Sequence, residues 1–133
     1  MTLEEFEKII TENQYKWIIR KHNKADNKYA HYSYIYVGFY NLYGTEQHLL
    51  TFYYDVEPCE YYSECKISEG SVSIHMLKPL MSVDGYVCDV ETDLNVVCFS
   101  KVSKFEPYFR DIVLQIKKLI IESRKTDMLC DFD

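Results

Sequence analysis

The stretch YSYIYVGFYNLY, residues 32–43, decides the expected fold because tyrosine alternates in it with apolar side chains. Successive side chains of a β-strand point to opposite faces. One predicted face carries Ile35, Val37 and Phe39. The other carries Tyr32, Tyr34, Tyr36 and Tyr40. The apolar set belongs in a core, so the tyrosines are expected to form a ladder on the second face of a sheet.

Further short runs with strand character extend this sheet in both directions. They cover residues 15–21, 49–55, 65–67, 72–76, 86–90 and 94–102. Turn signals separate them, including Gly44, a break at Lys78-Pro79 and the polar run 91–93. The pattern predicts an antiparallel meander of about six strands, in which residues 86–90 pair with residues 94–102.

A helix is expected at each end of the sheet. Thr2 and Glu5 form a capping box before a short amphipathic helix over residues 3–13. The second helix opens either with a Ser103–Glu106 box or with Pro107 at its first position. Its apolar stripe holds Phe105, Phe109, Ile112, Val113, Ile116, Leu119 and Ile120. We expect one α+β domain over residues 1–133, with this long helix on one sheet face and a loose tail from Thr126.

Composition places the chain among globular proteins. It has 133 residues, 47% hydrophobic and 27% charged, enough for one core without metal or disulfide. The acidic start Met1-Thr2-Leu3-Glu4-Glu5 is not that of a signal peptide, and no apolar run is long enough to span a membrane. The five cysteines form no paired motif, so free thiols in a reducing cytoplasm are expected, with no cofactor.

Negative charge is concentrated in the middle of the chain. Residues 44–99 carry ten acids and two bases, a net −8, whereas the whole protein has a formal charge of −6. An acidic surface repels nucleic acid and attracts basic protein surfaces. The charge distribution therefore favours a basic protein as the partner.

Ten of the thirteen tyrosines fall between residues 29 and 62, beside several of these acids. Tyrosine supplies large contact area at low entropy cost, so it is common on recognition surfaces. The predicted binding residues are Tyr32, Tyr34, Tyr36, Tyr40, Tyr53, Tyr54, Glu57, Glu60, Tyr61, Tyr62 and Glu64. In size and charge the chain resembles small intracellular inhibitors such as anti-CRISPR and other phage anti-defence proteins and toxin-immunity proteins. This likeness implies a non-enzymatic blocker of a basic partner, for example a nuclease, that presents acids in place of phosphates.

Three other interpretations stay open. A basic strip before the ladder, with Lys16, Arg20, Lys21, Lys24 and Lys28, suits single-stranded nucleic acid. The order Asp55, Glu64, Lys66 resembles the D…(D/E)-x-K pattern of metal-dependent nucleases, which implies Mg²⁺ held by the acids. An exposed aromatic face also suits pairing with a second copy of the chain.

Overall fold

The computed structural model describes residues 1–58 and 67–131, without the side chains of residues 126–131. The elements in chain order are α1 (Leu3–Glu12), β1 (Ile18–His22), the short 3-10 helix η1 (Lys24–Asp26), β2 (Ser33–Tyr40), β3 (Glu46–Tyr54), β4 (Val72–Met81), β5 (Val87–Phe99) and α3 (Val102–Asp131). The described strands form one antiparallel sheet of five in the order β1-β2-β3-β4-β5. Every strand thus pairs with its neighbour in the chain, as expected for a meander.

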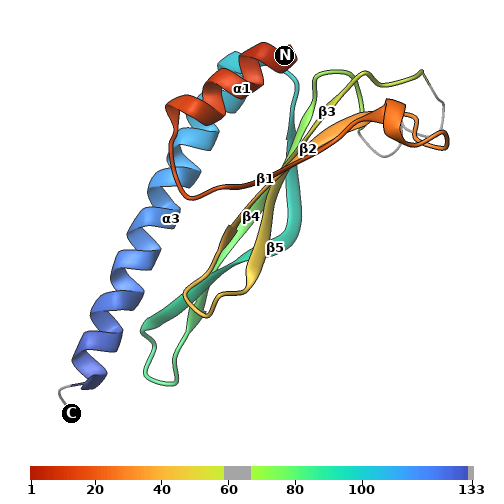
Figure 1. Ribbon diagram of the computed structural model, residues 1–133. Coiled ribbons are helices and arrows are strands. Elements are labelled where there is room, and N and C mark those ends of the chain that lie inside the picture. Colours follow the sequence, from red (N-terminus) through yellow and green to blue (C-terminus); the bar gives the residue numbers. More distant parts are fainter. Residues whose placement is uncertain (59–66, 132–133) are drawn as a thin grey trace.

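Both helices lie on the same side of the sheet (Figure 1). The core between the helices and the sheet contains stacked aromatic rings: Phe6 of α1 stacks on Phe52 of β3 with ring centroids 4.4 Å apart. Phe105 and Phe109 of α3 stack on each other at 5.4 Å, and Trp17 contacts Phe109 at 5.7 Å. The α+β architecture with a short first helix and a long last one is confirmed.

The ends of the helices confirm one expectation and correct two. The amide of Glu5 donates to Thr2 Oγ1 at 3.1 Å, and the amide of Thr2 donates to Glu5 Oε1 at 2.9 Å, which is the predicted capping box. The last helix begins at Val102, so Ser103 and Pro107 both lie inside it and neither predicted start is right. It also runs to Asp131, so the predicted loose tail from Thr126 is wrong. No Gly or Pro follows Pro107 to end the helix.

β4 and β5 are longer than predicted. Pro79 does not break β4 but pairs with Val90 in mid-strand. β4 pairs with β3 only over Val72–Ile74, so beyond Ile74 its one partner among the described strands is β5. A strand with a neighbour on one side only is where proline is tolerated in a sheet.

The predicted turn at residues 91–93 is also wrong, because β5 is one continuous strand. His75 pairs with Val96 but Leu77 pairs with Thr92, which leaves Asp93, Leu94 and Asn95 in a bulge. Extra residues in one strand of a pair form a β-bulge, which bends the strand but does not end the pairing. Two predicted strands therefore merge into one, which accounts for five observed strands rather than about six. Residues 65–66 of a further predicted strand lie outside the described residues.

No helix in the described part of the chain is long and apolar enough to cross a membrane.

Candidate binding face

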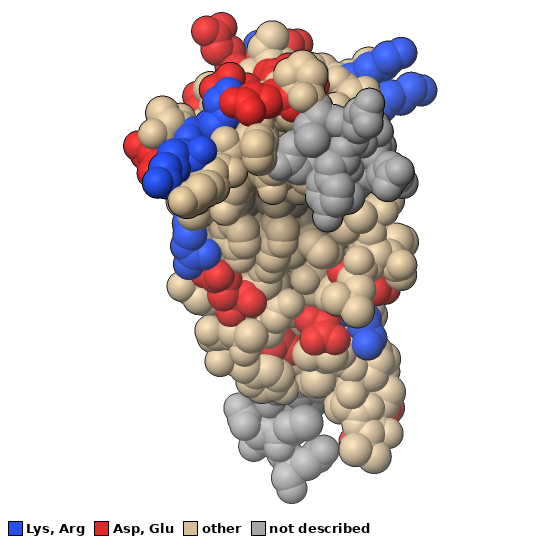
Figure 2. Space-filling view, turned by 90° about the vertical axis from the view of Figure 1, so that its right-hand side faces the viewer, with Lys and Arg blue, Asp and Glu red and all other residues tan. Residues whose placement is uncertain are grey.

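The helices leave one face of the sheet uncovered in the described structure, and we call it the open face. Ile35 and Val37 of β2 are buried beneath the helices, so Tyr34 and Tyr36 point the other way. The strand register adds neighbours from β3, β4 and β5. The open face consists of Tyr32, Tyr34, Tyr36, His48, Thr51, Tyr53, Ser73, His75 and Cys98. Figure 2 shows this side of the molecule, where charged side chains surround a central area that has none.

One group of ring contacts occupies the part of this face nearest η1. His22 stacks on Tyr34 with centroids 4.4 Å apart and planes 16° apart. Tyr32 lies 5.9 Å from Tyr34 and meets Tyr53 edge-on at 5.4 Å. These rings hold one another in place, so binding a partner costs them little further rotamer entropy.

A second group runs across β2, β3 and β4. The rings of Tyr36 and His48 stack at 4.6 Å, and His48 meets His75 at 4.8 Å. His48 Nε2 lies 2.7 Å from Thr51 Oγ1, and His75 Nδ1 donates to the carbonyl of Asp93 at 2.8 Å. Burial, and next the neighbouring His75, lower the pKa of His48 below 6.5. The open face therefore favours the neutral imidazole.

An ion pair borders the second group. Arg20 of β1 donates to Glu46 of β3 at 2.9 Å and lies 5.1 Å from the centre of the Tyr36 ring. The Tyr36 hydroxyl donates to the same carboxylate at 3.0 Å. The hydrogen bond from Arg20 holds the pKa of Glu46 below its ordinary value. Arg20, predicted to bind phosphate, already has a carboxylate partner.

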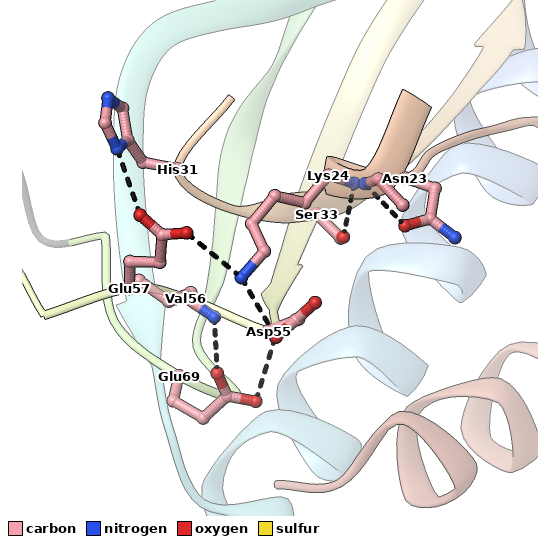
Figure 3. Close-up of polar contacts among 9 residues, drawn as sticks. Asn23, Lys24, His31, Ser33, Asp55, Val56, Glu57 and Glu69 are labelled. Atoms are coloured by element: carbon pink, nitrogen blue, oxygen red, sulfur yellow. Dashed lines mark hydrogen bonds and ion pairs between the residues drawn. The ribbon is translucent and has the colours of Figure 1, made fainter. Parts of the chain in front are cut away.

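A second charged cluster fixes the chain after β3 (Figure 3). Lys24 Nζ lies 3.3 Å from Asp55 Oδ1 and 3.4 Å from Glu57 Oε1. His31 Nδ1 lies 3.2 Å from Glu57 Oε2, and contacts from His31 and Lys24 lower the pKa of Glu57. Glu69 accepts the backbone amides of residues 55 and 56 at 3.1 and 2.7 Å. Two carboxylates, Asp55 and Glu57, thus share one ammonium group, and a third, Glu69, accepts only backbone amides.

The structure separates the predicted binding residues into several places. It brings Tyr32, Tyr34, Tyr36 and Tyr53 together on the open face. Tyr40 pairs with Glu46 at the end of β2 and lines a groove beside α3, and Tyr54 stacks on Phe52 against the core. Glu57 belongs to the Lys24 cluster. The other predicted residues, Glu60, Tyr61, Tyr62 and Glu64, lie outside the described residues.

Sequence reasoning missed the two histidines of this face. The alternation that puts Val72 and Ile74 in the core also puts His75 on the open face, so a signal for His75 was present. His48 had none, because the predicted strand began at residue 49 whereas β3 begins at Glu46. A bulge beside Val37 and Gly38 then sets His48 opposite Gly38.

The nuclease-like pattern of Asp55, Glu64 and Lys66 stays a prediction. Asp55 is engaged by Lys24, and Glu64 and Lys66 lie outside the described residues. Among the residues that the structure does describe, no group of three or more His, Cys, Asp or Glu side chains is placed to hold a metal ion. Cys88 and Cys98 are free thiols.

Comparison of the chain with protein-family models, with curated proteins and with solved structures finds no match. The open face, its ring contacts and its charged border therefore carry the functional argument.

Proposed function

We propose that this is a non-enzymatic binding protein that blocks a protein partner by docking its open face on it. The observation that carries the proposal is the set of stacked Tyr and His rings that α1 and α3 leave uncovered. Buried aromatic anchors dominate the energy of protein interfaces, and a charge-free centre with a charged border matches their usual anatomy. The chemistry of this face needs no bound metal or cofactor to bind a protein.

The border of the face supports a basic partner. In the Lys24 cluster, Asp55, Glu57 and Glu69 outnumber the single ammonium group, and the Arg20–Glu46 pair is neutral. Because the whole chain has a formal charge of −6, its field attracts positive surfaces and speeds their encounter. The inhibitor role and the basic partner follow from this charge and the aromatic face together.

The direct test is capture of partners from lysate of the encoding organism, followed by titration of the recovered protein with variants. Tyr34→Ala and Tyr53→Ala should each weaken binding at least about tenfold, the loss typical of aromatic anchors. Affinity for a basic partner should also fall as salt rises.

Tyr86→Ala is the matched control. Tyr86 is more exposed than Tyr34 and Tyr53, with 55% of its surface accessible, but it lies outside the open face, in the turn between β4 and β5. It should bind like the parent protein. A partner that binds Tyr34→Ala and Tyr53→Ala at full affinity would overturn the proposal, as would recovery of nucleic acid with no protein.

Single-stranded nucleic acid is the second candidate ligand. It is favoured by the cation and imidazole that lie against the ladder, Arg20 over Tyr36 and His22 on Tyr34. Against it, Arg20 pairs with Glu46, Lys21 with Glu7, and Lys24 with two acids. A labelled oligonucleotide titrated by fluorescence polarisation distinguishes the two, because only this candidate predicts binding that the Tyr34→Ala change abolishes.

A further inference from the structure

A groove of about 530 Å³ lies beside α3. It runs between the C-terminal half of α3, the segment that leads into β1 and the turn after β2. Its lining residues are Tyr15, Lys16, Tyr40, Asn41, Leu42, Lys117, Ile120, Ile121 and Arg124. Its volume falls in the range of sites that bind small molecules.

The charged side chains that line this groove are all positive. They are Lys16, Lys117 and Arg124, and no Asp or Glu is among the lining residues. None of the three forms an ion pair with a described residue, in contrast to Arg20, Lys21 and Lys24. Lys117 and Arg124 are two turns apart on α3 and so share a helix face. Among the side chains that the structure describes, these three cations of the groove thus have no acidic partner.

The remaining lining is largely apolar. Leu42, Ile120 and Ile121 line the same groove as the cations, and Ile121 keeps 52% of its surface exposed. Tyr15 is half-buried: burial raises its pKa, and the nearby Arg124 opposes that rise. An apolar floor beside several cations is complementary to a molecule with an apolar body and an anionic head.

We infer that this groove binds a small anionic amphiphile, a carboxylate with an apolar chain of the fatty-acid class. The carboxylate lies among Lys117, Arg124 and Lys16, where charge-assisted hydrogen bonds are available. The chain lies against Leu42 and Ile121 and removes their exposed apolar surface from water. This site is independent of the proposed function, because it shares no residue with the open face.

The test is calorimetric titration with dodecanoate below its micelle concentration, with dodecyltrimethylammonium as the cationic probe of equal chain length. Dodecanoate should bind at least about tenfold tighter than the cation, since three cations face its head group. Lys117→Glu and Arg124→Glu should each weaken dodecanoate about tenfold or more by the same Coulomb argument.

Lys118→Glu is the matched control, because it makes the same charge change on the same helix at a residue outside the groove lining. It should bind dodecanoate much like the parent, and circular dichroism should show all three variants folded. In amide NMR spectra, dodecanoate should shift Leu42 and Ile120 before any open-face residue.

Four results would overturn the inference. They are no binding of dodecanoate, equal binding of the two surfactants, an equal loss in Lys118→Glu, or shifts at the open face alone. Binding of an acidic peptide in place of dodecanoate would also overturn it and make the groove a protein contact.

Discussion

The two faces of β2 and β3 share one backbone but face different surroundings. On the helix side, Ile35, Val37, Leu50 and Phe52 are at most 2% exposed and pack with α1 and α3. On the open side, Tyr34, Tyr36 and Tyr53 contact mainly other aromatic rings, and no described helix covers them. Core packing explains the first set. The second set lies outside the core, and it is the aromatic surface on which the proposed binding function rests.

The largest expected effect comes from a core residue of this pair of faces. Phe52→Ala should lower the free energy of unfolding by about 3–5 kcal/mol, because it leaves a cavity under Phe6 and Tyr54. Tyr34→Ala should cost only about 1 kcal/mol or less, the value of a cross-strand contact. Urea denaturation measures both, and similar losses would contradict the proposed division between a stabilising face and a binding face.

A smaller loss is expected at Gly38, beneath the Tyr36 ring. A Cβ at Gly38 would lie 2.6 Å from the Gln47 carbonyl and 2.9 Å from the Tyr36 hydroxyl. Gly38→Ala should therefore cost about 1–3 kcal/mol through overpacking and should displace Tyr36 on the open face.

Tyr36→Phe provides the control for Gly38. It removes the contact with the hydroxyl but leaves those with the Gln47 carbonyl and with the ring carbon Cε1, at 3.0 Å, so the double variant should recover part of the lost stability. An unchanged free energy of unfolding in Gly38→Ala would show that the sheet accommodates the added methyl group at the bulge at no energetic cost, and would contradict this prediction.

The smallest expected effect is a pH dependence carried by His48. Its folded pKa is lowered below 6.5, so its neutral form contributes stability above that pH. The contribution is lost as pH falls from 6.5 through the folded pKa, because the unfolded chain then binds the extra proton. Glu46 and Glu57 have pKa values lowered from 4.5, so their contributions to stability are lost only as the pH falls below 4.5.

Melting temperatures of the parent and His48→Gln across these two ranges test the assignment. The variant should lose the change that begins near pH 6.5 and keep the one that begins below 4.5. The same slope in both proteins just below pH 6.5 would assign the effect to another group.

The sequence predicted those features of the fold that depend on local patterns. The alternation in residues 32–43 places Ile35 and Val37 in the core and Tyr34 and Tyr36 on the other face, as observed. The Thr2–Glu5 box and the apolar stripe of α3 likewise predicted a helix at each end. These signals are local, because strand parity and helix capping depend on residues only a few positions apart.

Errors arose where a distant contact decided the local structure. From the sequence, Pro79 predicts the end of a strand. In the structure β4 continues through it, because beyond Ile74 the described part of β4 pairs with β5 alone. The polar run 91–93 reads as a turn, but β4 holds Asp93 in a bulge through His75. Sequence periodicity carries no information about which edge is paired or where a register shifts.

By itself, then, the sequence determined an α+β meander with a tyrosine-rich sheet face and an acidic middle. Only the tertiary structure decided which tyrosines share the open face, which acids are paired, and that Lys16, Lys117 and Arg124 converge on one groove. The physical reason is that parity and amphipathicity are properties of a single segment. Pairing of charges and convergence of side chains are properties of how distant segments pack.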